Sequence, residues 1–402
     1  MSFLYYPSLF LFIISKYIDL ISFVGAPAYY AIIAERYINT AVLLLVFIQM
    51  CLSAGELLGR EVLKDYGRER TVKIMLLAVL TLAQMYWLLE KVWNYKAEPF
   101  YLIMALYLIA FSKGKSFQAI MKTFLLACSA LFLTAALGQN LGYTRDAMRI
   151  TDYGTKHAFG FVHPNTAAHV LQAILFAVWF LYLRGRRKET WLLFWISAFV
   201  LILWNRCRTV IITLLLFPVV LAIVDRWGGR AGRQKPGAWK YILSASPFLC
   251  LCLTLLLCIP IDLIHRFTYD TPLFSIGERF VQSGIALRTY GLPFIGHSID
   301  TSRTIKMLVD GVQIPLFVMD NAYISYGIIL GLLWLIPCLC FLSLANLRAW
   351  NGKNRALLLY GVFMAVFAIL ERRGLDPAFN MMFFYPLSVY KKRSARCRTS
   401  QK

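Results

Sequence analysis

Long apolar runs constrain this chain more than any other feature. Stretches of about fifteen to twenty apolar residues recur along its whole length, and 59% of the 402 residues are hydrophobic whereas 15% are charged. Runs of this length match the hydrocarbon core of a bilayer. Because hydrocarbon offers peptide groups no hydrogen-bonding partner, such runs cross it only as helices. The sequence therefore predicts an all-α integral membrane protein and excludes a soluble globular domain.

The apolar runs predict about twelve transmembrane helices in a single polytopic membrane domain covering residues 1–402. No soluble domain, low-complexity linker or internal repeat is evident in the sequence. The predicted spans are Tyr5–Val24, Ile38–Ala54, Ile74–Leu89, Phe100–Phe111, Thr123–Leu137, Thr166–Leu183, Trp191–Trp204, Val210–Val224, Tyr241–Ile261, Ala322–Leu344, Ala356–Leu370 and Ala378–Tyr390.

The net charge of +22 is unevenly distributed. Of the 42 Lys and Arg residues, 26 lie in segments that twelve spans would place on one side, including Arg184–Lys188 and the tail Lys391–Lys402. Basic loops mark the cytoplasmic side of a membrane protein, so we expect both termini in the cytoplasm. Insertion and attraction to anionic membrane lipids explain the positive charge, and we expect no nucleic-acid partner.

The nine cysteines do not form a metal-binding pattern. They lack a paired Cys-x-x-Cys set with histidine partners, and most of them fall within predicted spans. Cysteines in such positions usually pack as small apolar side chains. Since no cluster of carboxylates has the pattern of a divalent-metal site either, we expect no metal and no other cofactor.

Two long segments are predicted to face the exterior: Gly138–His163 and Asp262–Met319. The second is the longest stretch without a predicted span and forms one large loop in the C-terminal half of the chain. A helix is expected from about Ser275 to Tyr290, ended by Gly291 and Pro293 and folded back over the membrane. Ordered loops on a rigid scaffold commonly carry binding and catalytic residues.

Arg206 and Arg208 lie at a predicted outer turn between two apolar helices. Arginine at membrane depth is costly and usually faces a polar cavity or an anion. The alternative is that both side chains extend to the lipid headgroups. Two guanidinium groups suit a diphosphate because each can donate two parallel hydrogen bonds to its oxygens.

His163, Pro164 and Asn165 have the pattern of a helix start, and Arg149 and His157 precede them in the same outer segment. Asn can cap a helix, and a helix N-terminus attracts phosphate groups. Capping and packing are the alternative to substrate binding here. The several cations nearby favour contact with an anionic substrate.

Asp320 precedes a predicted span, and Arg279 lies in the expected loop helix. A carboxylate buried at the mouth of a span can have a raised pKa and act as a base. The alternative is that Asp320 caps the following helix. Other polar candidates in this half of the chain are Arg288, His297, Asn321 and the triplet Glu371–Arg373.

Four sequence blocks together resemble one family. They are Gly160-Phe-Val-His-Pro-Asn165, Arg206-Cys-Arg-Thr209, Arg279 followed by Tyr290-Gly-Leu-Pro-Phe-Ile-Gly296, and Asp320-Asn-Ala-Tyr323 followed by Gly327 and Gly331. In this order and on this hydropathy outline, the chain resembles the bacterial polysaccharide repeat-unit polymerases of the Wzy type, in the superfamily that they share with O-antigen ligases. The blocks extend over most of the chain.

The resemblance implies a GT-C-like multi-pass protein of the bacterial plasma membrane that uses undecaprenyl-diphosphate-linked oligosaccharide. It implies that Arg208 and Arg279 contact the diphosphate. A flippase and a chain-length regulator of the same pathway are the expected protein partners. The ligases carry a histidine where this chain has Asp320, which favours a polymerase and leaves the identity of the base open.

We therefore expect Arg206, Arg208 and Arg279 to bind the diphosphate and Asp320 to act as the base. The expected substrate contacts are Arg149, His157, His163, Asn165, Arg288, His297 and Asn321. Two alternatives remain. A ligase would transfer the glycan to a different acceptor, and a flippase of the same lipid-linked glycan would show internal repeats and broken helices, neither of which the sequence reveals.

Overall fold

The computed structural model describes residues 2–61, 97–151, 154–230, 238–261, 263–264, 274–297, 306–309, 312–315 and 319–390. This part of the chain is mostly helical, with little sheet. The predicted span Ile74–Leu89, the tail Lys391–Lys402 and much of the loop Asp262–Met319 lie outside the described residues.

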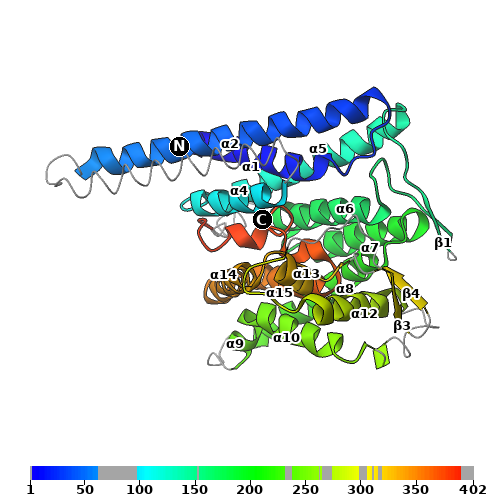
Figure 1. The fold of residues 1–402 in the computed structure, drawn as a ribbon. Helices are drawn as coiled ribbons and strands as arrows, with labels where there is room; N and C mark the ends of the chain where they lie inside the picture. Colours follow the sequence, from blue (N-terminus) through cyan, green and yellow to red (C-terminus); the bar gives the residue numbers. More distant parts are fainter. Residues whose placement is uncertain are drawn as a thin grey trace, which may run out of the picture. The chain divides into compact units, whose positions relative to one another are not determined.

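The elements, shown in Figure 1, follow the order of the chain. They are α1 (Ser2–Ile18), α2 (Ala26–Glu61), α4 (Ala97–Phe111), α5 (Phe117–Asn140), β1 (Arg149–Thr151), β2 (Gly154–Lys156), α6 (Pro164–Val178), η1 (Trp179–Leu183), α7 (Arg187–Trp204), α8 (Arg208–Arg230), α9 (Trp239–Ser244), α10 (Ser246–Cys258), α12 (Phe274–Tyr290), β3 (Lys306–Val309), β4 (Val312–Pro315), α13 (Ala322–Ile329), α14 (Leu332–Asn351), α15 (Arg355–Leu370), η3 (Arg372–Leu375) and η4 (Met381–Phe384).

Four helical segments of the described chain are long and apolar enough to cross a membrane. They are Ile33–Leu52 within α2, α5, the continuous segment Pro164–Leu183 made of α6 and η1, and α14. Five more apolar helices are shorter. The structure is therefore compatible with an all-α membrane protein, and the predicted number of twelve spans is not confirmed.

The chain divides into two compact units. The first consists of Met1–Glu189, Ile196–Val210 and Leu387–Lys402, and the second of Thr190–Trp195 and Ile211–Pro386. In the first unit α1 packs on α2, α4 and α5, and α5 packs on α6. In the second unit α10 and α14 pack on α15, and α12 packs on α10 and α13.

The helix expected in the large loop is confirmed as α12. It ends where Gly291 adopts a φ of +64°, a conformation that glycine reaches without steric cost. Its Gly284 lies so close to α10 that an added Cβ would stand 2.4 Å from the Cys258 carbonyl oxygen. Ala286 of α12 is buried with Ile324 of α13. The loop helix is thus packed firmly within the second unit.

The predicted span Ala322–Leu344 is broken into α13 and α14. The turn after α12 supplies the backbone partners that the break requires: Leu332 N donates to Pro293 O at 2.9 Å, and Leu333 N donates to Phe294 O at 3.0 Å. This close approach needs Gly331, which has a φ of +81° and no room for a Cβ. The expectation of unbroken helices is therefore wrong at this position.

The predicted span Ala378–Tyr390 is also wrong, because this segment forms only the short 3-10 helix η4 between turns. Local side-chain bonds compete with a helix here: Asp376 accepts from Ala378 N at 2.9 Å, and Asn380 accepts from Met382 N at 3.1 Å. Arg348 of α14 donates to the carbonyls of Tyr385, at 2.6 Å, and Pro386. Irregular backbone of this kind is tolerated in a membrane protein where protein buries it.

Short strands interrupt the all-α prediction in both long segments. β1 pairs antiparallel with β2, and β3 pairs antiparallel with β4. In addition, α1 ends at Ile18 rather than continuing to Val24, and Ile21 and Phe23 form isolated bridges to Phe161 and Thr144. These contacts attach the first predicted outer segment to the end of α1.

Candidate active site

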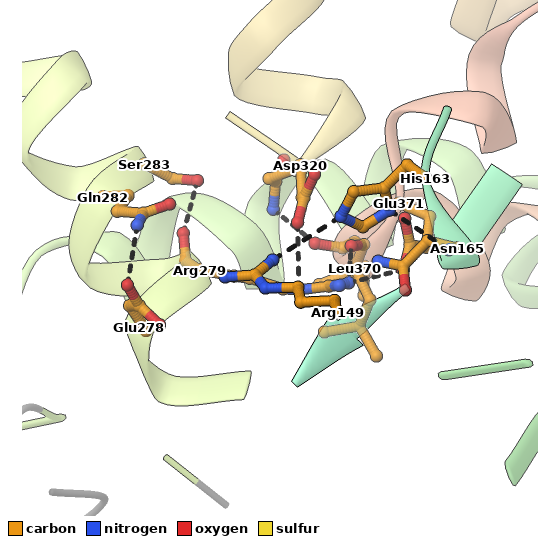
Figure 2. Close-up of polar contacts among 12 residues, drawn as sticks. Arg149, His163, Asn165, Glu278, Arg279, Gln282, Ser283, Asp320, Leu370 and Glu371 are labelled. Atoms are coloured by element: carbon orange, nitrogen blue, oxygen red, sulfur yellow. Dashed lines mark hydrogen bonds and ion pairs between the residues drawn. The ribbon is translucent and has the colours of Figure 1, made fainter. Parts of the chain in front are cut away.

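Arg279 is the centre of a charged cluster in the second unit (Figure 2). Its Nη1 donates to Glu371 Oε1 at 2.7 Å and also to the carbonyl oxygen of Leu370. Its Nε lies 3.2 Å from Asp320 Oδ2. One guanidinium group from α12 therefore contacts the end of α15 and the residue two positions before α13.

Asn321 fixes the start of α13 to the end of α15. Its Oδ1 accepts from Ile324 N at 3.1 Å, and its Nδ2 donates to Ile369 O at 2.7 Å. Asn321 is thus the N-cap of α13, and the alternative that Asp320 caps this helix is wrong. Asn321 is fully buried with both ends of its amide engaged, so it fixes the backbone next to Asp320, and its contact with a substrate stays a prediction.

Burial raises the pKa of Asp320 from 3.8 to about 6. Arg279 opposes this effect by favouring the charged form, and so does Arg373, whereas Glu371 and Glu278 raise the pKa further. The Asp320 side chain nevertheless keeps 32% of its surface exposed. A carboxylate with a pKa near 6 is mostly ionised at neutral pH and takes up a proton more readily than an ordinary aspartate, as a general base requires.

Glu371 is the member of this charged cluster that the sequence singled out least clearly. Its side chain is only 5% exposed, and its backbone N–H donates to Phe367 O at 2.8 Å at the end of α15. In the sequence, Glu371 is a carboxylate directly after an apolar run and before two arginines. This pattern does not reveal that its partner is Arg279. Breaking a buried ion pair costs about 3–5 kcal/mol, whereas an exposed pair contributes about 0.2–1 kcal/mol. Glu371 is therefore the stronger partner of Arg279.

Arg288 and His297 do not join this cluster. Arg288 lies nine positions after Arg279, which places it on the opposite side of α12 and about 13 Å along the helix axis. Its Nη2 donates to Ile259 O at 3.0 Å. His297 is exposed, with its ring 6.3 Å from the Tyr290 ring and its backbone N–H bonded to Ile328 O.

A second polar group lies in the first unit, at the start of α6. His163 Nδ1 accepts from Asn165 N at 3.1 Å, so His163 is the N-cap of α6, and the idea that Asn165 caps this helix is wrong. Arg149 of β1 brings its Nη1 to within 3.5 Å of His163 Nε2 (Figure 2). The positive end of the α6 dipole adds to the positive potential of Arg149.

His157 is held by Asp146, which sequence reasoning missed. Asp146 Oδ2 lies 2.6 Å from His157 Nδ1, and Asp146 Oδ1 accepts from Ala158 N at 2.6 Å and from Phe159 N at 3.2 Å. The His157 side chain is 35% exposed. No periodicity or spacing signal connects Asp146 to His157 in the sequence, because the pairing depends on how the outer segment folds.

Asn205 joins the turn before α8 to this group. It is fully buried, and its Nδ2 donates to His157 O and to Pro164 O, each at 2.8 Å. The next residue, Arg206, has a φ of +56° and lies against the backbone of Gly154, where an added Cβ would stand 1.9 Å from its Nη1. Arg208 begins α8 and is half-buried.

The predicted site residues thus form two groups. Arg206 and Arg208 lie in the first unit with Arg149, His157, His163 and Asn165, whereas Arg279, Asp320 and Asn321 lie in the second. The single anion site predicted from Arg206, Arg208 and Arg279 stays a prediction.

Within the described part of the chain, no three His, Cys, Asp or Glu side chains gather as metal ligands would. Comparison of the chain with family models, with curated proteins and with solved structures found no significant match.

Proposed function

We propose that this protein is a membrane glycosyltransferase that polymerises undecaprenyl-diphosphate-linked oligosaccharide repeat units at the outer face of the bacterial plasma membrane. The observation that supports it best is the pairing of Asp320 with Arg279. The partly buried carboxylate of Asp320, just before α13, has a raised pKa and lies beside the guanidinium group of Arg279. The four sequence blocks that resemble the polymerases include both residues.

The reaction needs a base and a cation. The bond between the anomeric carbon of the glycan and the diphosphate oxygen breaks as that carbon bonds to the hydroxyl oxygen of a second repeat unit. In this proposal the hydroxyl proton passes to Asp320, and Arg279 stabilises the charge that develops on the departing diphosphate. The resemblance to the polymerases suggests inversion at the anomeric carbon.

The polar group of the first unit has a binding role in this proposal. Within this group Arg206 and Arg208 would bind diphosphate oxygens, as the resemblance to the polymerases implies for Arg208, and His157, His163 and Arg149 would contact the glycan or its diphosphate. A helix N-terminus next to a cation favours such anionic groups. The GT-C-like arrangement remains part of the proposal.

The test is polymer formation by the purified protein from lipid-linked repeat units. The wild type should yield a ladder of lipid-linked products, and Asp320→Asn should lower its rate about 10²- to 10⁴-fold. Glu189→Gln, which removes an exposed carboxylate at the start of α7, is the matched control and should keep the wild-type rate. A wild-type ladder from Asp320→Asn would refute the base assignment. Single additions to a foreign acceptor would indicate a ligase.

A transporter of the same lipid-linked glycan is the second candidate, and the break between α13 and α14 favours it. Broken helices are a feature of transporters that bind substrate between helix halves. Proteoliposomes separate the two functions. Movement of lipid-linked oligosaccharide across the bilayer without longer products would establish the transporter and exclude the polymerase.

The proposed orientation places both termini in the cytoplasm. Reporter fusions at Lys353, between α14 and α15, should be cytoplasmic, and fusions at Gly142, after α5, should be external. A cytoplasmic reporter at Gly142 would place the outer segment on the wrong side for the proposed substrate.

A further inference from the structure

We propose that Glu371 is the permanent partner of Arg279 and Asp320 its exchangeable partner, so that a diphosphate takes the place of Asp320 and releases that carboxylate to accept a proton. This inference rests on the proposed function, since it describes how an anionic substrate would activate the base. It makes Glu371 a positioning residue, which holds Arg279 without contacting the reacting atoms.

The two carboxylates hold Arg279 very differently. Glu371 and the Leu370 carbonyl both accept from Nη1, and the Glu371 side chain is only 5% exposed. Its backbone is fixed as well, because Gly374 N donates to its carbonyl at 3.0 Å. Moving Glu371 would disturb the end of α15 and the start of η3.

Asp320 is the weaker partner. It meets Arg279 through Nε at the longer distance of 3.2 Å, and 32% of its side-chain surface is exposed. Asn321 caps α13, so Asp320 can move without uncapping that helix. An anion approaching Arg279 can therefore displace Asp320 without dismantling the helix ends around it.

The charged groups around Asp320 couple anion binding at Arg279 to proton uptake by Asp320. The charges that act on Asp320 are Glu278 and Arg279 from α12, Glu371 from the end of α15 and Arg373 from η3. When a diphosphate occupies Arg279, Asp320 loses its attractive partner and gains a negative neighbour. Both changes raise its proton affinity, so diphosphate binding favours proton uptake by Asp320, and the coupling is reciprocal. In the reaction, the attacking hydroxyl would supply that proton.

Calorimetry with a dimethyl ester of diphosphate, methylated once on each phosphate, tests the exchange. Neither phosphate of this probe titrates near neutral pH, so any proton taken up belongs to the protein. The full chain in detergent micelles is titrated at pH 6.5 in two buffers that differ in ionisation enthalpy. We expect the wild type to take up about half a proton per bound diphosphate.

Three variants distinguish exchange from mere structural support. Asp320→Asn should bind the probe about two- to fivefold more tightly, because the competing ion pair is gone, and should take up no proton. Glu371→Gln keeps an acceptor for Nη1 but removes a charge that raises the pKa of Asp320, so its proton uptake should shift to lower pH. Arg279→Gln should abolish binding, and Glu189→Gln should behave as the wild type.

Absence of binding or of proton uptake in the wild type would overturn the exchange, as would unchanged uptake in Asp320→Asn or weaker binding by that variant. An unshifted uptake profile in Glu371→Gln would refute the electrostatic effect of Glu371 on Asp320, and unchanged probe affinity in Glu371→Ala, which also removes the acceptor for Nη1, would refute its positioning role. The ladder assay tests the polymerase separately from the exchange. A ladder without proton-linked binding leaves the polymerase and removes the exchange, whereas proton-linked binding without a ladder does the reverse.

Discussion

Replacing Asp320 with Asn should stabilise the protein while it impairs turnover. The pKa of this carboxyl is raised from 3.8 to about 6 by burial, so folding disfavours its charged form in spite of Arg279. A pKa above the unfolded value means that stability is gained as pH falls through about 6 and lost as pH rises. Asn is nearly isosteric with Asp and carries no charge, so the variant avoids that loss at every pH.

The expected gain follows from the raised pKa. At about 1.36 kcal/mol for each tenfold change in the ionisation equilibrium, the change from 3.8 to about 6 corresponds to about 3 kcal/mol. The side chain is 32% exposed, and solvent screening reduces this to about 1–2 kcal/mol. For a unit of this size that energy raises the melting temperature by about 2–8 °C.

Thermal melting of the purified protein in detergent, followed by tryptophan fluorescence, measures the effect. At pH 8 the Asp320→Asn variant should melt above the wild type, and at about pH 4, where Asp320 is protonated in the folded protein, the two should converge. A variant that melts below the wild type at pH 8 would refute the reasoning. It would mean that the ion pair with Arg279 outweighs the burial of the charge.

Three further substitutions test the contacts that hold the helix ends and turns of the second unit. Asn321→Ala removes the α13 cap and a buried hydrogen bond, and should cost about 2–4 kcal/mol, seen as a lower melting temperature at unchanged pH dependence. Gly331→Ala should destabilise the folded protein by more than about 2 kcal/mol, because the new Cβ would stand 2.5 Å from Phe294 O. Gly185→Ala is the control, since Gly185 also has a positive φ but has open space around it, and it should cost clearly less. Equal melting temperatures of the two variants would disprove the steric argument. Arg348→Gln should speed protease cleavage of the irregular segment after α15, since two carbonyls lose a charged donor. Arg348→Lys should restore part of the protection. Cleavage of Arg348→Gln at the wild-type rate would contradict this role of Arg348.

The sequence by itself determined that the described chain is mostly helical and apolar. Hydropathy placed α15, α7 and the continuous segment of α6 and η1 within four residues at each end, whereas α5 begins six residues before its predicted start, because a run of apolar residues favours a helix without fixing its ends. The end of α12 was equally readable, since Gly291 stops a helix through its own backbone.

Hydropathy failed where the backbone departs from a helix while remaining buried. The segment after α15 is as apolar as a span. However, Asp376 and Asn380 accept hydrogen bonds from nearby backbone N–H groups, and Arg348 donates to two of its carbonyl oxygens. The break before Gly331 likewise depends on the turn after α12 supplying hydrogen bonds. Such partners come from distant parts of the chain, which no local pattern contains.

Sequence reasoning named Arg279 and Asp320 as candidates from residue type and position, and only the tertiary structure paired them with each other and with Glu371. It also decided that Asn321, not Asp320, caps α13, and that Asp146 holds His157. The sequence specifies which residues can carry charge, but the strength of an ion pair depends on the distance between its two groups and on their burial. Those are set when helices far apart in the chain pack together.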